Sequence, residues 1–223
     1  MSCWAVIPAA GTGERFGGTK PKPLADLSGK PVIAHTLAVF EACADVDGVV
    51  VVVHCDWLED YKGMIRELKL EKVRAVIAGG NTRTQSVRHG LEAVDRQAQV
   101  VMVHDGVRPF VDEAMIQRAL LAVHSTGAAV AGVRVKPTIK VVDRVSQVVC
   151  ETLDRDLLWE IQTPQVFDRV LLERAYRQGG AGASDDAALV ERMGIGVKVF
   201  EGAYTNIKIT TPEDMLVARA FLV

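Results

Sequence analysis

Short apolar runs rich in β-branched residues alternate with stretches of helical periodicity over the first 135 residues. Buried apolar runs separated by amphipathic helices are typical of parallel strands joined by right-handed crossovers. The pattern therefore predicts an α/β fold with a mostly parallel sheet in a three-layer arrangement. The predicted strands lie at 4–8, 48–54, 72–78, 100–104 and 128–133. The predicted helices lie around 32–44, 57–70, 82–94 and 113–124.

The alternation breaks after Val135, where 139–142 and 147–150 are predicted as two strands around a turn at 143–146. This β-hairpin is too short and too polar to enclose a core of its own, so we expect it to project as an arm. We therefore predict one domain over 1–223 with an inserted arm at about 136–155. The apolar face of the arm, which a second subunit is expected to cover, is predicted to consist of Ile139, Val141, Val148 and Cys150.

The C-terminal part returns to the strand pattern at 197–200 and 207–209 and then begins a last helix. Thr211 can cap this helix, Pro212 suits its first position, and Asp214 favours the positive end of its dipole.

Composition is that of a globular protein, with 49% hydrophobic and 24% charged residues among 223. A net charge of -2 argues against a protein that coats nucleic acid. No apolar run is long enough to span a membrane, and no basic segment precedes an apolar one at the N-terminus, so we expect neither a membrane span nor a signal peptide. The four cysteines lie far apart in the sequence, and we expect no Cys/His cluster. They are Cys3, Cys43, Cys55 and Cys150. This pattern is typical of a reduced cytoplasmic protein.

A glycine-rich loop, residues 8–17, follows the first predicted strand at the edge where open α/β sheets bind ligands. Three interpretations compete. A dinucleotide fingerprint needs a glycine at position 16, but this chain has Phe16 there and its glycine comes one residue later, at Gly17. A Walker A loop needs Gly-Lys-Ser/Thr, which this loop lacks. The third is a phosphate cradle flanked by Arg15 and Lys22, whose charges suit phosphoryl or nucleotidyl transfer. A plain turn with two solvated cations remains the alternative.

Polar groups follow two other predicted strands. Gly79 and Gly80 permit a tight turn, after which Ser86 faces the sheet edge. Asp105 and Arg108 lie three residues apart and can bind sugar hydroxyls and a phosphate, although a mutual ion pair is equally compatible with the spacing. Two further segments carry little signal by themselves: 161–165 is interpreted as a polar turn, and Lys208 as a solvated strand residue.

Six motifs together strongly resemble the 2-C-methyl-D-erythritol 4-phosphate cytidylyltransferases, in order and over almost the whole chain. They are Pro8-Ala9-Ala10-Gly11-x-Gly13-x-Arg15, Pro21-Lys22, His104-Asp105-x-x-Arg108-Pro109, Thr152-x-Asp154-Arg155-x-x-x-Trp159, Thr163-Pro164-Gln165-x-Phe167 and Asn206-Ile207-Lys208-Ile209-Thr210. The resemblance implies a Rossmann-like nucleotidyltransferase fold, a homodimer formed through the arms, Mg²⁺-dependent use of CTP, and a place in isoprenoid precursor synthesis. It also implies a cytoplasmic location, or the plastid stroma in a plant.

The resemblance also implies roles for individual residues. The catalytic groups are expected to be Arg15, Lys22, Arg155 and Lys208. The nucleotide is expected to contact Ala9, Ala10, Gly11, Gly13, Gly80, Ser86, Asp105 and Gly106. The acceptor is expected to contact Asp105, Arg108, Thr138, Arg155, Thr163 and Lys208, with Thr138 and Arg155 supplied by the partner's arm. The metal ligands are not implied, although Asp105 is a candidate.

Two positions depart from the family pattern: Pro23 replaces a glutamine and Val107 replaces an alanine. Neither removes a charge, but Val107 beside the ligand leaves the identity of the polyol open. A ribitol 5-phosphate cytidylyltransferase is therefore an alternative. A non-catalytic nucleotide-binding regulator and, with less support from the glycine spacing, a dehydrogenase are the others.

Overall fold

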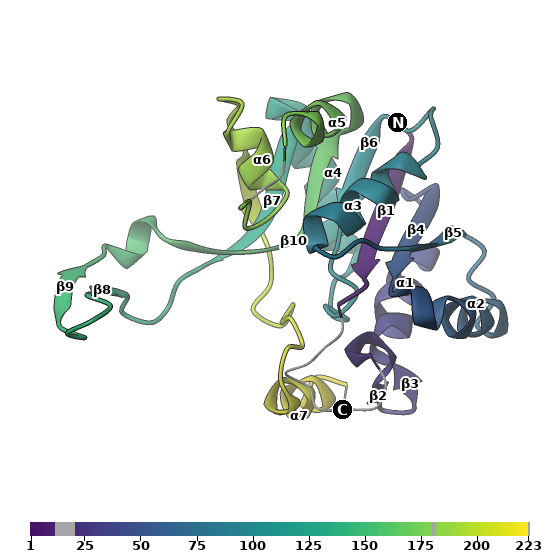
Figure 1. The fold of residues 1–223 in the computed structure, drawn as a ribbon, viewed down its shortest axis with the longest axis horizontal. Helices are drawn as coiled ribbons and strands as arrows, with labels where there is room; N and C mark the ends of the chain where they lie inside the picture. Colours follow the sequence, from purple (N-terminus) through teal and green to yellow (C-terminus); the bar gives the residue numbers. More distant parts are fainter. Residues whose placement is uncertain (12–20, 180–181, 223) are drawn as a thin grey trace.

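The computed structural model describes residues 1–11, 21–179 and 182–222, and Figure 1 shows a central sheet covered by helices on both faces. Over these residues a seven-stranded sheet has the order β11-β7-β10-β6-β1-β4-β5. Its strands are β1 (Cys3–Ala9), β4 (Gly48–Val53), β5 (Val73–Ala78), β6 (Val100–Val103), β7 (Ala128–Arg134), β10 (Trp159–Asp168) and β11 (Lys198–Glu201). All neighbours pair in parallel except β10, which runs antiparallel to β6 and β7.

All the helices of the described residues except the last one divide between the two faces of the sheet, which gives the predicted three layers. One core cluster contains side chains of α1, α2 and α4, and the other contains side chains of α3, α5 and α6. The helices are α1 (Val32–Ala42), α2 (Leu58–Glu67), α3 (Arg83–Glu92), α4 (Glu113–Thr126), α5 (Arg169–Arg177), α6 (Ala187–Glu191) and α7 (Pro212–Ala220). In the described ranges, no helix has the length and apolar character needed to cross a membrane.

The five strands and four helices predicted for the first 135 residues are confirmed, with small shifts at their ends. Strand β4 is buried at every position because it lies inside the sheet with helices on both faces. Helix α4 begins where the Asp112 carboxylate accepts a hydrogen bond from the Met115 backbone N–H, at 2.6 Å. It ends at Gly127, whose φ of +75° is the left-handed conformation that glycine adopts easily.

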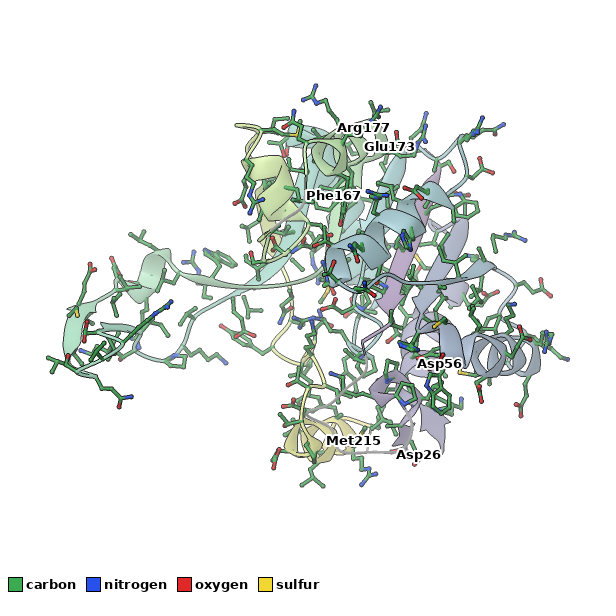
Figure 2. All side chains as sticks on the ribbon, viewed as in Figure 1. Asp26, Asp56, Phe167, Glu173, Arg177 and Met215 are labelled. Atoms are coloured by element: carbon green, nitrogen blue, oxygen red, sulfur yellow. The ribbon has the colours of Figure 1, made fainter. Side chains whose placement is uncertain are left out.

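The interpretation of 161–165 as a polar turn is wrong, because these residues lie inside β10. Gln162 and Gln165 are 3% and 1% exposed, and each hydrogen-bonds to residues distant in sequence. The pairing of β10 with β7 is interrupted between Ile161 and Gln165, so Thr163 is released from the ladder in the middle of the strand. Figure 2 shows Phe167, at the far end of β10, packed within the main domain.

The C-terminal segment matches the prediction in part. Strand β11 forms, and Thr211 and Asp214 make a capping box at the start of α7. The strand expected at 207–209 is absent from the described chain. Its backbone is held instead by single bonds such as Ile209 N–H to the Val107 carbonyl, at 2.9 Å, because no neighbouring strand is available for a ladder.

The predicted arm projects well away from the main sheet as a hairpin of β8 (Lys140–Val142) and β9 (Val149–Thr152) (Figure 1). A separate two-residue hairpin, β2 (Asp26–Leu27) with β3 (Lys30–Pro31), precedes α1. The arm's large apolar side chains are exposed within the single chain, with Val145 at 94% and Val148 at 61%.

The register of the arm differs from the prediction. The second strand begins at Val149, which pairs with Val142, while Val141 lies opposite Glu151. The shift occurs because the turn is longer than predicted: Gln147 adopts a φ of +55° and belongs to it. The predicted apolar face is therefore interrupted by a charged residue.

Candidate active site

The functional residues gather at the edge of the sheet where the parallel strands end. Strand β6 leads into His104 and Asp105 beside the end of β1. The backbone fixes this proximity, because His104 N–H donates to the Val6 carbonyl at 3.0 Å and Gly106 N–H to the Pro8 carbonyl at 3.3 Å. A Cβ at Gly106 would lie 3.2–3.3 Å from neighbouring side chains, including Ala9. The glycine therefore lets the Asp105 loop lie close to the start of the glycine-rich loop.

Asp105 lies at the centre of a cluster of three cations. Its Oδ2 is 2.9 Å from Lys208 Nζ and 3.6 Å from Arg108 Nε, and its Oδ1 is 3.3 Å from Arg83 Nε. The side chain is only 9% exposed. Burial alone would raise the pKa of this carboxyl group, but Lys208, Arg83 and Arg108 together hold it well below its usual value. Asp105 is therefore ionised throughout the physiological range.

Arg108 pairs with Asp105, as one interpretation allowed, but it is also built into the site. Its Nη1 donates to the Asn206 carbonyl at 2.7 Å, and the residue is 8% exposed. Burial lowers the pKa of Arg108, and its Nε has no hydrogen-bond partner among the described residues. The guanidinium is therefore a fixed positive charge that can attract an incoming anion.

Lys208 is not the solvated surface residue that its strand pattern indicated. The segment before it is anchored by Asn206, which is fully buried and donates from Nδ2 to the Thr163 carbonyl at 2.8 Å. This anchor directs Lys208 onto Asp105 while leaving its side chain 38% exposed. The ammonium group can therefore reach both the carboxylate and a ligand.

His104 and Thr163 form a buried chain of hydrogen bonds beneath Asp105. His104 Nε2 lies 3.1 Å from the Arg108 carbonyl, which can only accept, so Nε2 carries the proton. Burial lowers the pKa of His104 to about 4, so the ring is neutral and Nδ1 must accept. The Thr163 hydroxyl therefore donates to His104 Nδ1 at 3.1 Å, while its oxygen accepts the Asp105 N–H at 3.0 Å. Thr163 has only an acceptor left for a ligand.

The predicted base-binding residues lie together at the start of α3. Gly80 N–H donates to Ser86 Oγ at 3.1 Å, and the Ser86 hydroxyl donates to the Thr82 carbonyl at 3.0 Å. A Cβ at Gly79 would lie 2.6 Å from the Ala10 Cβ. The glycine thus allows close approach between the two loops.

Of the other predicted residues, those on the arm lie away from this cluster within one chain. Gly13 and Arg15 lie outside the described residues. Lys22 begins a 3-10 turn, η2 (Lys22–Leu24), between the buried residues Pro21 and Pro23. Thr138 and Arg155 are exposed on the arm. Arg155 is the first residue of the turn η4 (Arg155–Leu157), and its Nη1 donates to the Lys136 carbonyl at 3.1 Å. Within one chain the structure therefore joins Asp105, Arg108, Thr163 and Lys208 but not the arm residues.

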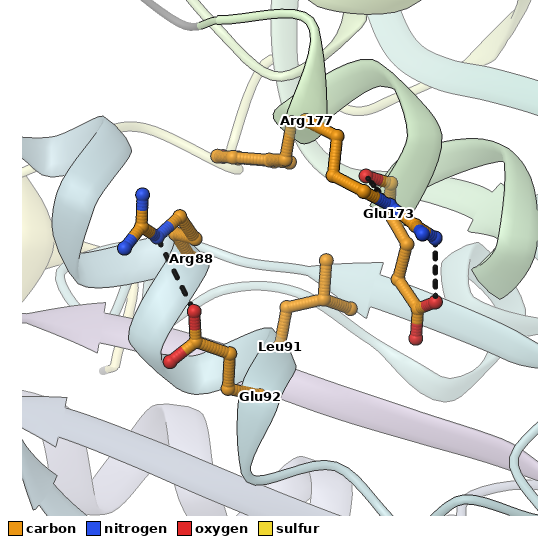
Figure 3. A pocket seen from close by; sticks show the side chains of 6 residues that line it. Arg88, Leu91, Glu92, Glu173 and Arg177 are labelled. Atoms are coloured by element: carbon orange, nitrogen blue, oxygen red, sulfur yellow. Dashed lines mark hydrogen bonds and ion pairs between the residues drawn. The ribbon is translucent and has the colours of Figure 1, made fainter.

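A pocket of about 460 Å³ opens elsewhere, between α3 and α5 (Figure 3). Its charged side chains pair among themselves: Arg88 with Glu92 at 3.2 Å and Arg177 with Glu173 at 3.4 Å. Because these charges neutralise one another, the pocket is less suited to a triphosphate than the Asp105 cluster, where three cations surround one acid.

Sequence analysis missed two features of this edge. Arg83 carried no local signal, since it follows the N-cap residue Thr82 like any first helical residue. The expectation of no Cys/His cluster is also wrong, because adjacent side chains of His54, Cys55 and Asp56 bring three potential metal ligands within 4.8 Å. Here they stabilise the turn η3 (Cys55–Trp57) through the His54 ring, which accepts the Asp56 N–H at 3.3 Å.

An α/β sheet with a cation-rich site beside a glycine-rich loop at its carboxyl edge defines a nucleotidyltransferase of the Rossmann-like class. The comparisons specify which one. The family model for 2-C-methyl-D-erythritol 4-phosphate cytidylyltransferase matches residues 3–223. The chain belongs to this family.

Relatives of that name support the assignment over nearly full length. The chain is 45% identical to the one from Dehalococcoides mccartyi over 218 residues, covering 98% of this chain and 95% of the relative. The chain is 41% identical to the relative from Syntrophus aciditrophicus over 222 residues, which cover 98% of this chain and 94% of the relative. The crystal structure of 4-diphosphocytidyl-2C-methyl-D-erythritol synthase from Anaerococcus prevotii superposes with a TM-score of 0.87 at 32% identity. The match covers 99% of this chain and 96% of that structure.

Proposed function

We propose that the chain transfers the cytidylyl group of CTP to 2-C-methyl-D-erythritol 4-phosphate, in the non-mevalonate route to isoprenoid precursors. The products are 4-diphosphocytidyl-2-C-methyl-D-erythritol and pyrophosphate. The observation that carries this proposal is the joining of Asp105, Arg108 and Lys208 at one sheet edge, in a chain that matches the family from residue 3 to 223.

The chemistry needs charge stabilisation rather than a base. A phosphate monoester, whose second pKa is about 6, is largely dianionic at neutral pH and is itself a nucleophile. One of its oxygens attacks the α-phosphorus of CTP, a new P–O bond forms, and the bond to the β-phosphate breaks to release pyrophosphate. Arg15 and Lys22 stabilise the charge on the five-coordinate phosphorus, and Arg155 and Lys208 hold the attacking phosphate.

The nucleotide is assigned to the loops that meet beside β1. The triphosphate is assigned to Ala9, Ala10, Gly11 and Gly13, because small residues let backbone N–H groups approach an anion. The cytosine and ribose lie against Gly80, Ser86, Asp105 and Gly106. The support is the close approach of Gly79 to Ala10 and of Gly106 to Ala9, which joins these loops into one surface.

The acceptor is assigned to Asp105, Arg108, Thr163 and Lys208, completed by Thr138 and Arg155 from a partner's arm. Two observations support a homodimer. The arm exposes Val145, Val148 and Val149 within the single chain, and the cluster lacks the arm residues without a second copy. We further propose that residues 1–223 act as one catalytic domain in the cytoplasm, a reducing compartment that suits the four free cysteines.

Mg²⁺ is proposed to enter with CTP, carried by phosphate oxygens and water as magnesium often is. Asp105 does not fit as its protein ligand, since three cations already neutralise that carboxylate. The His54, Cys55 and Asp56 group does not fit either, because magnesium prefers oxygen ligands to imidazole and thiol.

A pyrophosphate-release assay tests the proposal by crossing four nucleoside triphosphates with two acceptors, 2-C-methyl-D-erythritol 4-phosphate and ribitol 5-phosphate. We expect turnover with CTP and the first acceptor. Faster turnover with ribitol 5-phosphate would support the alternative polyol, and no release with any pair would support a non-catalytic regulator. Light scattering at micromolar concentration should show a dimer, and a monomer would contradict the role of the arm.

A further inference from the structure

Arg83, the first residue of α3, bridges two carboxylates. Its Nε is 3.3 Å from Asp105 Oδ1, and its Nη2 is 2.8 Å from Asp186 Oδ2. Burial alone would lower the pKa of Arg83, but the attraction of Asp186 and Asp105 outweighs burial and holds it above its usual value. The guanidinium is therefore a permanent charge with two fixed partners.

The second partner, Asp186, is held firmly from behind. It is 1% exposed, and the Tyr176 hydroxyl donates to its Oδ1. The adjoining backbone is tied to β10, because Gln165 Oε1 accepts the Ala187 N–H at 3.1 Å. Gln165 Nε2 also donates to Asp185 Oδ2 at 2.8 Å. Asp186 thus fixes Arg83 from a part of the molecule that the proposed substrates do not touch.

The three cations around Asp105 differ in what else they can do. Lys208 is 38% exposed and can turn towards an incoming phosphate, whereas the Arg108 side chain is 10% exposed and is held by the Asn206 carbonyl. Arg83 cannot turn in the same way as Lys208 without breaking its pair with the buried Asp186. When a dianionic acceptor draws Lys208 away, Asp105 keeps Arg83, at 3.3 Å, as its nearest counter-ion.

We propose that Arg83 is a positioning residue that acts as the permanent counter-ion of Asp105, which releases Lys208 to bind the phosphate of the acceptor. This inference rests on the proposed function, since it assigns Lys208 to the acceptor. The charged and titratable groups that face Asp105 are Arg83 from α3, Lys208 from the 205–210 segment, and His104 and Arg108 from its own loop.

Replacing Arg83 with glutamine should therefore raise the KM for the polyol phosphate. Lys208 would remain drawn to Asp105, and the acceptor would have to displace it. We expect an increase of about tenfold or more, equivalent to about 1.4 kcal/mol. The KM for CTP should stay within about threefold, because the Asp105 backbone is held by Thr163 rather than by Arg83. Arg83→Lys keeps the positive charge but lacks the planar guanidinium that can bond two carboxylates at once, so its KM for the polyol phosphate should lie between those of the unmodified protein and Arg83→Gln.

A matched control lies five residues further along the same helix. Arg88→Gln makes the same change of charge at a side chain that is 59% exposed and pairs with Glu92 outside the cluster (Figure 3). Its kinetics should equal those of the unmodified protein. Because Arg83→Gln leaves Asp186 as a buried unpaired charge, it can destabilise the fold. The double variant Arg83→Gln/Asp186→Asn removes both charges and should melt close to the unmodified protein while keeping the raised acceptor KM.

The outcomes separate this inference from the proposed function. If the unmodified protein shows no turnover with CTP and either polyol phosphate, the proposed function fails and the inference fails with it. If it is active but the double variant has an unchanged acceptor KM, only the inference is overturned. Equal rises in both KM values, in a variant that melts early, would overturn it as well, since they would indicate a purely structural role.

Discussion

Replacement of Thr163 by valine keeps the shape of a buried side chain but removes its hydroxyl group. That hydroxyl accepts the Asp105 N–H at 3.0 Å and donates to His104 Nδ1 at 3.1 Å, and both partners are buried. The variant therefore leaves one donor and one acceptor without a partner. Each unsatisfied buried group costs about 1–3 kcal/mol, so we expect a loss of stability of about 2–6 kcal/mol.

For a chain of this size that loss corresponds to a fall in melting temperature of about 4–24 °C. Thr163→Ser is the matched control: it keeps both hydrogen bonds and should cost only about 1 kcal/mol for the lost methyl group. Thermal and chemical unfolding of the two variants measure the difference. If valine proved as stable as serine while kcat/KM collapsed, Thr163 would act on the substrate rather than on His104 and Asp105, and the assigned tautomer would be wrong.

Three further predictions address other parts of the site. Lys22→Ala should lower kcat by about 10²–10³ while changing the KM for CTP much less, because a preset transition-state contact is lost; near-normal kcat in steady-state kinetics would refute it. Ser86→Ala removes the acceptor of the Gly80 N–H, so the KM for CTP should rise with little change for the acceptor, and the opposite pattern would misplace the base. His104 is neutral in the fold with its pKa lowered to about 4, against 6.5 for a free side chain, so the unfolded chain takes up its proton first as pH falls. Its contribution to stability should be lost between about pH 6.5 and 4, at up to about 1.4 kcal/mol per pH unit, and His104→Asn should remove this slope in unfolding experiments.

The first half of the fold was predictable because its signals are local. Strand β4 contains an unbroken valine run and is buried throughout, and α1, which precedes it, has helical periodicity. Strand β10 was missed because Gln162 and Gln165 look exposed in sequence. They are buried because their hydrogen-bond partners come from Ala203 and from 185–187, and local sequence does not reveal such partners.

The site was predictable to a similar degree. Asp105 and Arg108 follow a strand that could be located, so their place at the sheet edge could be inferred. The three-cation arrangement could not, because Arg83 and Lys208 reach Asp105 from segments 22 and 103 residues away in sequence. Asp186 had a weak signal, as an acid directly before the apolar start of α6, but its pairing with Arg83 depends on tertiary packing.

The central claim is that the phosphate of the acceptor becomes the second phosphate of a cytidine diphosphate ester. Incubation of the unmodified protein with CTP and 2-C-methyl-D-erythritol 4-phosphate carrying ¹⁸O in its phosphate tests it most directly, with the product examined by mass spectrometry and ³¹P NMR. We expect a coupled diphosphate that retains ¹⁸O in the new P–O–P bridge. Release of pyrophosphate without that bridge, or recovery of unchanged CTP, would contradict it.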